Sequence, residues 1–256
     1  MDQDRLRRER EFFDASSSAQ FGDDTPAPTE HVQALLARVG DTSGMRVLDC
    51  GCGAGELTIP IAAGGSVVTA FDVSPESVRL MRERAARDGL RAPDGVVASM
   101  ERLPFAPSTF DVAVGKSILH HVEIGPAMDE VRRVLIHGGR GVFLENQVTN
   151  PVLRFARARL SGRFGVARLG TIDEHPFVAR DYAAIRARFP VVRLNYPDFR
   201  FFGLFSRNVL RYRRALWLAR ALGRLDAFVF RHLPFLRKYG YHVILEVRGD
   251  DSVNPA

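Results

Sequence analysis

The sequence predicts an α/β protein built on an open sheet of about seven mostly parallel strands, with helices on both faces. Short apolar runs alternate with amphipathic segments at βαβ spacing from residue 45 to residue 145. The glycine-rich turn D-C-G-C-G-A-G at 49–55 follows the first apolar run and precedes a helical pattern. An apolar fraction of 46% is ample for a packed core. An N-terminal helical segment and a helical insertion before the last strand complete the prediction.

The composition favours one large domain, or one domain with an elaboration, in a chain of 256 residues. No window approaches the roughly 20 uninterrupted apolar residues of a membrane span. The charged N-terminus, M-D-Q-D-R-L-R-R-E-R, is not typical of a secretory signal. Cys50 and Cys52 are the only cysteines, and no further zinc ligands stand near them at suitable spacing. We therefore expect no metal and a reduced, cytoplasmic protein.

The N-terminal 40 residues predict a helical cap on the domain. Residues 5–13 can form one helix, residues 16–28 are small, polar and broken by proline, and a second helix begins at Thr29 and ends at Gly40. Phe12, Phe13 and Phe21 are apolar positions in an otherwise polar lead-in. They either cover the ligand site as a lid or dock the segment on the domain.

The central part of the chain predicts five strands, each a short apolar run. The helix between the second and third strands starts at Ser74-Pro75, an N-cap followed by a helix-opening proline, and ends before Gly89. The helix before the fifth strand is expected to stop at His137-Gly138-Gly139. The predicted strands are 45–48, 66–71, 95–98, 110–114 and 141–145, and the third helix covers 126–136.

Beyond residue 150 the alternation loosens and arginine dominates the charge. The net charge is +6, with lysine only at Lys116 and Lys238. This bias indicates either an anionic partner or arginine-covered solvated helices. We expect helices at 151–160, 179–189, 208–223 and 225–233, a loop at 161–174, strands at 191–196 and 241–247, and a frayed tail at 249–256.

The glycine turn favours a nucleotide ligand, because three alternating glycines let a ligand approach the backbone amides. A dinucleotide fingerprint needs G-x-G-x-x-G, but Glu56 stands where the third glycine belongs when counted from Gly51. A phosphate-binding P-loop needs Gly-Lys-Ser/Thr, which does not follow. Asp49 stands two residues before the first glycine, where a carboxylate suits an ammonium better than a pyrophosphate.

The ordered motifs resemble those of class I S-adenosylmethionine-dependent methyltransferases, of the small-molecule, domain 11/25 type. V-L-D-C-G-C-G-A-G is similar to the first motif and F-D-V-S-P at 71–75 to the second. M-E-R-L-P-F at 100–105, S-I-L-H-H-V at 117–122 and R-R-V-L-I-H-G-G-R at 132–140 are similar to later motifs. The resemblance covers about residues 40–147. It implies a Rossmann-like core at 41–150 that binds S-adenosylmethionine, between a cap at 1–40 and an acceptor-side or lid region at 151–248.

The resemblance also implies a role for each matching residue. Asp49 would lie by the methionine ammonium, and Asp72 would accept from both ribose hydroxyls. Val73 would pack on the adenine, and Gly115 and Lys116 would lie near the sulfonium. Ser99 stands where relatives often have Asp, which weakens the expected contact with the adenine amino group. The complete predicted set is Asp49, Gly51, Cys52, Gly53, Asp72, Val73, Ser99, Met100, Glu101, Gly115 and Lys116; the two cysteines are expected mainly to pack beneath the turn.

The acceptor chemistry stays open from the sequence. A base is needed only if the acceptor must lose a proton; His120, His121 and Glu145 stand at the carboxyl edge of the sheet, and His175 in the insertion. The imidazoles could instead brace the local helix. V-G-K-S after the fourth strand is not the Asn/Asp-Pro-Pro-aromatic run of base-amine methylation, which argues against nucleic acid.

The sequence therefore favours methylation of a small, secondary-metabolite-like or amphiphilic acceptor, at oxygen, nitrogen or carbon. A lipid acceptor with peripheral membrane contact is one alternative, because the arginine-rich helices beyond residue 207 mix apolar and basic faces. A nucleic-acid acceptor and an inactive cofactor-binding interaction protein are the others. A monomer and a homodimer both fit.

Overall fold

A single mixed sheet organises the computed structural model, which describes residues 3–20, 29–91, 93–147, 149–160, 177–199, 201–202 and 216–249. The strand order is β3-β2-β1-β4-β5-β7-β6, with β1 to β5 mutually parallel. Strand β7 runs antiparallel to both β5 and β6. The strands are β1 (Arg46–Cys50), β2 (Val67–Asp72), β3 (Asp94–Val97), β4 (Phe110–Lys116), β5 (Leu135–Asn146), β6 (Val191–Asn195) and β7 (His242–Arg248). The expected open, mostly parallel sheet is confirmed.

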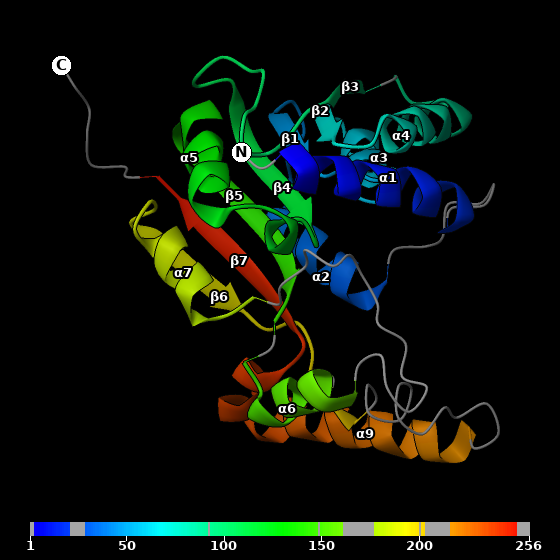
Figure 1. Cartoon of the computed structure of the whole chain (residues 1–256), viewed down its shortest axis with the longest axis vertical. Helices are drawn as coiled ribbons and strands as arrows, with labels where there is room; N and C mark the ends of the chain where they lie inside the picture. The colour runs from blue at the N-terminus through cyan, green and yellow to red at the C-terminus, as the bar shows by residue number, and fades with distance from the viewer. Residues whose placement is uncertain are drawn as a thin grey trace.

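Helices cover both faces of this sheet (Figure 1). One buried cluster joins the strands to α5 and α7, and a second joins them to α2 and α3. The helices are α1 (Gln3–Gln20), α2 (Glu30–Val39), α3 (Thr58–Ala63), α4 (Pro75–Arg87), η1 (Leu119–His121), α5 (Ile124–Val134), α6 (Pro151–Leu160), α7 (Ala179–Arg186), α9 (Leu216–His232) and η2 (Pro234–Tyr239).

The sequence forms these elements for simple physical reasons. In β1, Val47 packs into the cluster with α2 and α3, while Leu48 packs into the cluster with α5 and α7, so the strand is apolar on both sides. The start of α4 has the predicted cap, in which Ser74 Oγ accepts a hydrogen bond from Ser77 N at 3.0 Å and Pro75 occupies the first turn.

Three local predictions were wrong. Residues 16–20 are helical, so α1 extends to Gln20 instead of ending in a loop. Helix α5 ends at Val134 and β5 begins at once, because Leu135 already has an extended backbone and pairs with Phe110. Helix α9 continues through Gly223, where the sequence had indicated a break. At Gly223 the helix continues despite the helix-breaking tendency of glycine, and at Leu135 strand pairing ends the helix before its glycines.

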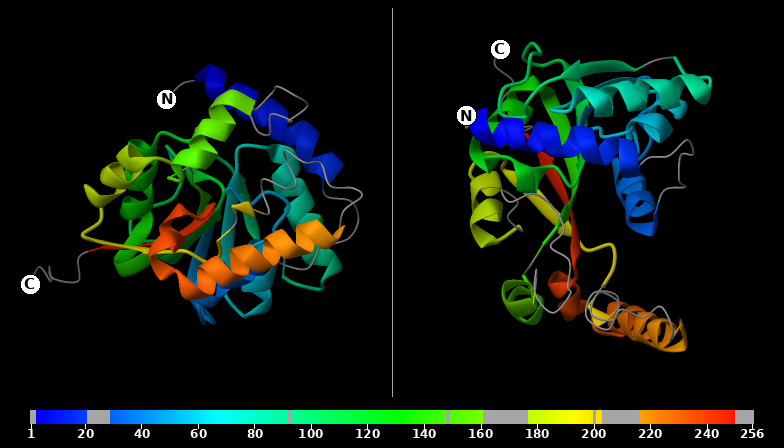
Figure 2. Two further views of the ribbon diagram at one scale, coloured as in Figure 1. Left: turned by 90° about the horizontal axis from the view of Figure 1, so that it is seen from below. Right: turned by 45° about the vertical axis from the view of Figure 1, so that its right-hand side comes forward.

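The carboxyl ends of the parallel strands face two layers of helix. Helix α1 packs against α4 and crosses near the ends of β2 and β4. Helices α6 and α9 with η2 lie beyond the far end of β5 and the start of β7, at the lower end of the molecule (Figures 1 and 2). A ligand at this edge of the sheet would therefore lie between the two layers.

Candidate functional site

The glycine turn after β1 is held in a left-handed backbone conformation. Gly51, Gly53 and Gly55 have φ values of 69°, 49° and 89°, which favour glycine. The carbonyl oxygen of Phe71 accepts hydrogen bonds from Gly51 N at 2.9 Å and from Cys52 N at 3.0 Å. A Cβ atom added at Gly53 would have no atom within 4 Å. The turn is therefore tied to β2 on one side and has open space at Gly53.

Replacing Gly51 with alanine is expected to lower the free energy of unfolding by about 2–3 kcal/mol. The new Cβ would lie 2.8 Å from Ile118 Cδ1 and 3.2 Å from Ile118 Cβ, in addition to the strain at φ 69°. Gly89→Ala is the matched control, since Gly89 has φ 68° but no atom within 4 Å of the added Cβ. Urea denaturation of both variants measures the difference. Equal losses would contradict close packing between the turn and Ile118.

Asp49 is the next-to-last residue of β1, in the buried part of the strand, and is 1% exposed. Its Oδ2 accepts a hydrogen bond from Thr58 Oγ1 at 2.5 Å. Its Oδ1 is buried, and within the described part of the chain no group donates a hydrogen bond to it. Burial raises the pKa of Asp49 from 3.8 to about 7, although the Thr58 hydroxyl opposes the rise. An orphaned buried carboxylate oxygen suits a cationic ligand.

Asp72, the last residue of β2, is the second carboxylate of the site. Its Oδ2 accepts from Gly53 N and its Oδ1 from Ser74 N, each at 2.9 Å. Burial raises the pKa of Asp72, although these backbone donors oppose the rise. Each carboxylate oxygen has capacity for a further hydrogen bond. Asp72 can therefore hold the glycine turn in place and also accept from a ligand hydroxyl.

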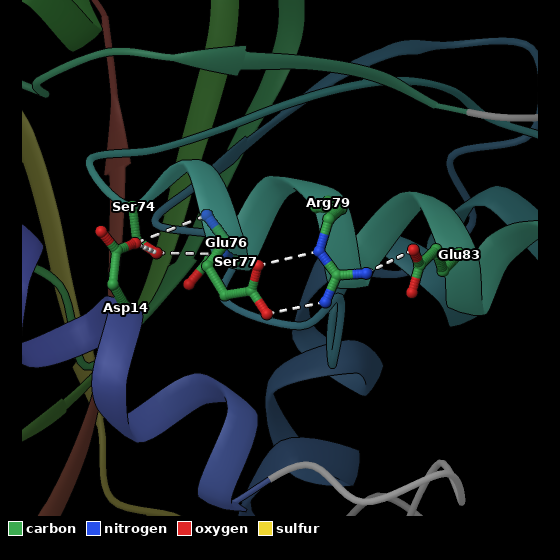
Figure 3. Close-up of polar contacts among 6 residues, drawn as sticks. All are labelled: Asp14, Ser74, Glu76, Ser77, Arg79 and Glu83. Atoms are coloured by element: carbon green, nitrogen blue, oxygen red, sulfur yellow. Dashed lines mark hydrogen bonds and ion pairs between the residues drawn. The ribbon is translucent and has the colours of Figure 1, made fainter.

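Helix α1 is docked on the loop that follows β2 (Figure 3). Arg10 Nε donates to the carbonyl oxygen of Val73 at 3.1 Å. Asp14 Oδ1 accepts from Ser74 Oγ at 2.5 Å and lies 3.4 Å from Glu76 N. Because Ser74 also caps α4, the N-terminal helix is joined to the start of a core helix.

The open hollow beside these contacts is lined by Asp14, Pro75, Glu76 and Arg79. Arg79 does not offer its charge to a ligand there, since it is paired with Glu76 and Glu83 along the exposed face of α4 (Figure 3). The hollow lies on the outer surface of α1 and α4. The glycine turn is therefore a better candidate for the functional site than this hollow.

Helix α1 also reaches the turn that follows β3. Arg5 forms an ion pair with Glu101, whose Oε1 in addition accepts from Glu123 N at 2.8 Å. Ser99 Oγ accepts from Glu101 N at 3.3 Å. The acidic residue expected to border an adenine is therefore engaged by the N-terminal helix. These contacts agree with docking of the N-terminal segment on the domain, and a lid over the site stays a prediction.

The end of β4 closes the site beside the glycine turn. A Cβ at Gly115 would lie 2.9 Å from both Ile118 Cγ2 and Phe143 Cδ1, so only glycine fits. Lys116 forms an ion pair with Glu56, which follows the glycine turn. Ser117 adopts a left-handed backbone with φ 54°, which is unusual for a residue with a side chain. Such strain often occurs at functional sites.

Glu145 on β5 organises the turn after β4. Its side chain is fully buried, and Oε1 accepts from Ile118 N at 2.9 Å and from Leu119 N at 2.7 Å. Its Oε2 lies 2.7 Å from His120 Nδ1. Both carboxylate oxygens are thus used within the chain, and Glu145 is better suited to orient His120 than to take a proton from an acceptor.

The remaining predicted residues take several positions. His121 Nδ1 lies 3.0 Å from Glu9 Oε2, and its ring packs edge-on against Phe13, so α1 holds it. Cys52 packs with Ala70, Val78 and Met81, and Met100 lies in the main core. His175 lies outside the described residues.

His31, Asp198 and His242 form a separate cluster at the carboxyl edge, with potential ligand atoms within 4.8 Å of one another. His242 Nδ1 lies 2.8 Å from Asp198 Oδ2. The two imidazole rings stack at 4.4 Å with planes 18° apart. Lone pairs of stacked rings lie in nearly parallel planes and do not converge on one ion. The cluster is therefore a ring stack with a carboxylate, and it gives no reason to expect a metal.

Some residues of the candidate site could not be predicted from the sequence. Thr58 is the only described side chain that donates to Asp49, but one threonine at the start of a helix is unremarkable by pattern. Arg5 and Glu9 contact the site across about 90 to 110 residues of chain. The positive φ of Ser117 depends on its three-dimensional setting.

Within the described residues, no helix is long and apolar enough to cross a membrane.

Comparison with known proteins finds a family match in the core of the chain. Residues 48–143 match the family model described as a methyltransferase domain. Over 138 residues the chain is 31% identical to the ubiquinone biosynthesis O-methyltransferase of Methylocella silvestris, which covers 53% of each protein. The chain thus spans about half the length of the curated relatives it matches.

Solved structures share the fold at low identity. The geranyl diphosphate C-methyltransferase of Streptomyces coelicolor A3(2) aligns with a TM-score of 0.61 and 14% identity, covering 96% of this chain and 98% of that one. The [4+2]-cyclase SpnF aligns with a TM-score of 0.60 and 18% identity, covering 94% of each chain. Identities this low show a common fold and nothing of the acceptor.

Proposed function

Because residues 48–143 form a methyltransferase domain with the class I fold, we propose that this protein transfers a methyl group from S-adenosylmethionine to a small-molecule acceptor. The orphaned Oδ1 of buried Asp49 is the observation that carries the proposal. An ammonium beside it would supply the missing donor and stabilise the charged carboxylate. The α-ammonium of S-adenosylmethionine meets this need, whereas NAD has no such group.

The rest of the turn fits the same ligand. Asp72 keeps two backbone amides as donors and would accept from the ribose hydroxyls. Gly53 has open space on its Cβ side, so a ligand can approach the backbone there. Val73 and Glu101 are proposed to border the adenine. We retain Gly51, Ser99, Gly115 and Lys116 as proposed contacts, and assign Cys52 and Met100 a packing role beneath the site.

When bound, S-adenosylmethionine supplies a methyl group activated by the adjacent sulfonium, so the transfer needs no metal. The protein's own contribution is to align the acceptor and exclude water. For an acceptor that must lose a proton, His120 is our proposed base. Glu145 holds its Nδ1, so proton exchange with the acceptor would pass through Nε2. His121 and Glu145 are proposed as positioning residues.

The acceptor is proposed to be small and partly apolar. The relative with 31% identity over 138 residues is named for ubiquinone biosynthesis, which supports this class. Segments 1–40 and 151–248 would form the cap and the acceptor side around the core. A cytoplasmic location and a monomer or homodimer belong to the same proposal. The similar fold of a [4+2]-cyclase keeps a binding or non-methylating role as the second candidate.

Isothermal titration with S-adenosylmethionine, S-adenosylhomocysteine and NAD tests the cofactor. We expect the first two to bind and NAD not to bind; the reverse result would overturn the proposal. Incubation of cell extract with methyl-labelled cofactor then tests transfer. Label in the small-molecule fraction supports the proposed acceptor class. Label in nucleic acid or bulk lipid would contradict it, and binding without transfer would favour the second candidate.

His120→Asn is expected to lower the single-turnover methyl-transfer rate by about 10²- to 10⁴-fold for an acceptor that must be deprotonated. Cofactor affinity should be unchanged, because the ring is proposed to act on the acceptor. His137→Asn, at an exposed position on β5, is the control and should retain the rate. If the methyl-transfer rate of His120→Asn depended on pH as it does in the parent protein, His120 would not be the base.

A further inference from the structure

The helical layer beyond the sheet exposes large apolar side chains that the proposed methyl transfer does not explain. On α9, Trp217, Leu225 and Phe228 are 71%, 40% and 54% exposed. On α6 and η2, Val152, Phe155 and Phe235 are between 57% and 67% exposed. Isolated exposed apolar residues are ordinary, but six on the helices of one layer indicate an interaction surface. We call these six residues, together with Arg220, Arg224 and Arg231 of α9, the outer surface.

The exposed residues of α9 lie on one side of the helix. At 100° per residue, Trp217, Leu225 and Phe228 fall within an arc of roughly 80°. The far side of the helix is anchored to the protein, since Asp226 Oδ1 accepts from Phe201 N and Phe202 N at 3.1 and 3.0 Å, and the adjoining Val229 is buried. The helix therefore packs by one face and presents a second apolar face outward.

Basic residues border the apolar side chains throughout this layer. Helix α6 carries three arginines and no acid. Residues 216–240 carry four arginines and one lysine, and their only acid is buried Asp226. On α9, Arg220, Arg224 and Arg231 fall within about 40° of arc beside the apolar stripe. A surface with this composition fits the interface of an anionic bilayer, where apolar groups enter the acyl boundary and arginines face phosphates.

Hydrogen bonds join this helical layer to the segment that follows β5. Gln147, just after β5, donates from Nε2 to the carbonyl oxygens of Lys238 and Gly240 at 3.1 Å each. Thr149 Oγ1 donates to the carbonyl oxygen of Lys238 at 2.7 Å. The layer of α6, α9 and η2 therefore lies beyond the carboxyl end of β5, which is the edge of the sheet where the glycine turn follows β1 (Figures 1 and 2).

We propose that the outer surface docks this protein on membranes that contain anionic phospholipid, with α6, α9 and η2 lying in the interface plane. A second copy of the chain is a poorer occupant, because a two-fold interface would bring like arginine rows together. A nucleic acid is disfavoured because aliphatic Val152 and Leu225 are interleaved with the aromatic residues, where stacking platforms would be expected. Docking does not depend on the proposed methyl transfer, since binding to a bilayer needs no turnover.

Trp217 is the only tryptophan in the chain, so its fluorescence reports directly on this surface. With the full-length protein we expect vesicles of phosphatidylcholine and phosphatidylglycerol to shift its emission to the blue and to pellet the protein. Brominated lipid should quench the emission, and high salt should weaken binding. Vesicles of phosphatidylcholine alone should bind far less.

Phe228→Ser combined with Phe235→Ser should reduce vesicle binding by on the order of tenfold, and Arg220→Gln with Arg224→Gln by a similar factor. The controls are Val67→Ser with Val97→Ser and Arg7→Gln with Arg180→Gln, which alter exposed residues elsewhere. Circular dichroism and cofactor titration verify folding. The proposal would be overturned if anionic vesicles caused no blue shift of the Trp217 emission, or if the control variants lost as much binding. It would also be overturned if the emission shifted with protein concentration in the absence of lipid, or only on addition of an oligonucleotide.

Discussion

Asp49→Asn is expected to weaken S-adenosylmethionine binding by about 100-fold while making the unliganded protein more stable above about pH 7. Both effects have one cause, the burial of a carboxylate that lacks a partner on Oδ1. Asparagine keeps an oxygen that can accept from Thr58 but carries no charge for an ammonium. A variant that loses the ligand and gains stability would identify Asp49 as a group kept for binding.

The stability effect has a defined pH dependence. The pKa of Asp49 is about 7 in the folded protein and 3.8 ordinarily, so between these values the folded state binds a proton that the unfolded state lacks. The stabilisation from this group is therefore fully present below about pH 3.8 and is lost as the pH rises from there to about 7. A rise of about 3 units corresponds to at most about 4 kcal/mol. If the poorer contact with Thr58 costs about 2 kcal/mol at every pH, we expect Asp49→Asn to gain about 2 kcal/mol near pH 8 and to lose about 2 kcal/mol near pH 4.

Urea denaturation across this pH range measures the stability difference, and titration calorimetry measures the affinity. The Kd of the parent protein should rise up to about tenfold per unit as pH falls below about 7, because binding requires the ionised carboxylate. Asp72→Asn is the matched control. It should also weaken binding, but it should lower stability, since Asp72 accepts from Gly53 N and Ser74 N. An Asp49→Asn variant with the parent's affinity would refute the proposed ammonium contact.

Glu145→Ala is expected to lower the free energy of unfolding by about 3–5 kcal/mol. The substitution would leave Ile118 N and Leu119 N without their acceptor, would remove the partner of His120 Nδ1, and would open a cavity in the core. Urea denaturation gives the magnitude. Glu145→Gln should lose less, because its amide oxygen still accepts from the two backbone groups.

The same pair of variants separates orientation from proton transfer. Glu145→Gln should keep cofactor affinity but shift the pH profile of methyl transfer, since the charge beside His120 is removed. Glu246→Gln, on the neighbouring strand β7, is the control and should change neither property. A Glu145→Ala variant as stable as the parent would show that the turn after β4 does not depend on this carboxylate.

Much of the fold could be predicted from the sequence because the patterns that indicate its elements are local. The apolar run before Asp49, the glycines of the turn and the Ser74-Pro75 cap each depend on neighbours within a few residues. The prediction failed where long-range pairing decided the outcome. Leu135 enters β5 because Phe110 pairs with it, and Gly223 stays helical within α9. Glycine propensity placed the end of α5 at residues 137–139, after the true end, and wrongly indicated a break at Gly223.

The two carboxylates of the candidate site could be selected from the sequence, because each follows a predicted strand whose carboxyl end lies at the ligand edge. The pKa values of these carboxylates could not be predicted from the sequence, since the raised pKa of Asp49 depends on burial by atoms from several elements. Glu145 was correctly placed at this edge. Its engagement by Ile118 and Leu119 appeared only with the tertiary contacts.

The sequence by itself determined the order of strands and helices, the glycine turn and the acids beside it, because hydrophobic period and backbone freedom are properties of short segments. Only the tertiary structure decided that α1 docks on the ligand-site loops through Arg5 and Asp14, and that α9 turns Trp217 and Phe228 outward. Such contacts join residues far apart in the chain. Their free energy depends on which surfaces are buried together, and a local pattern does not contain that information.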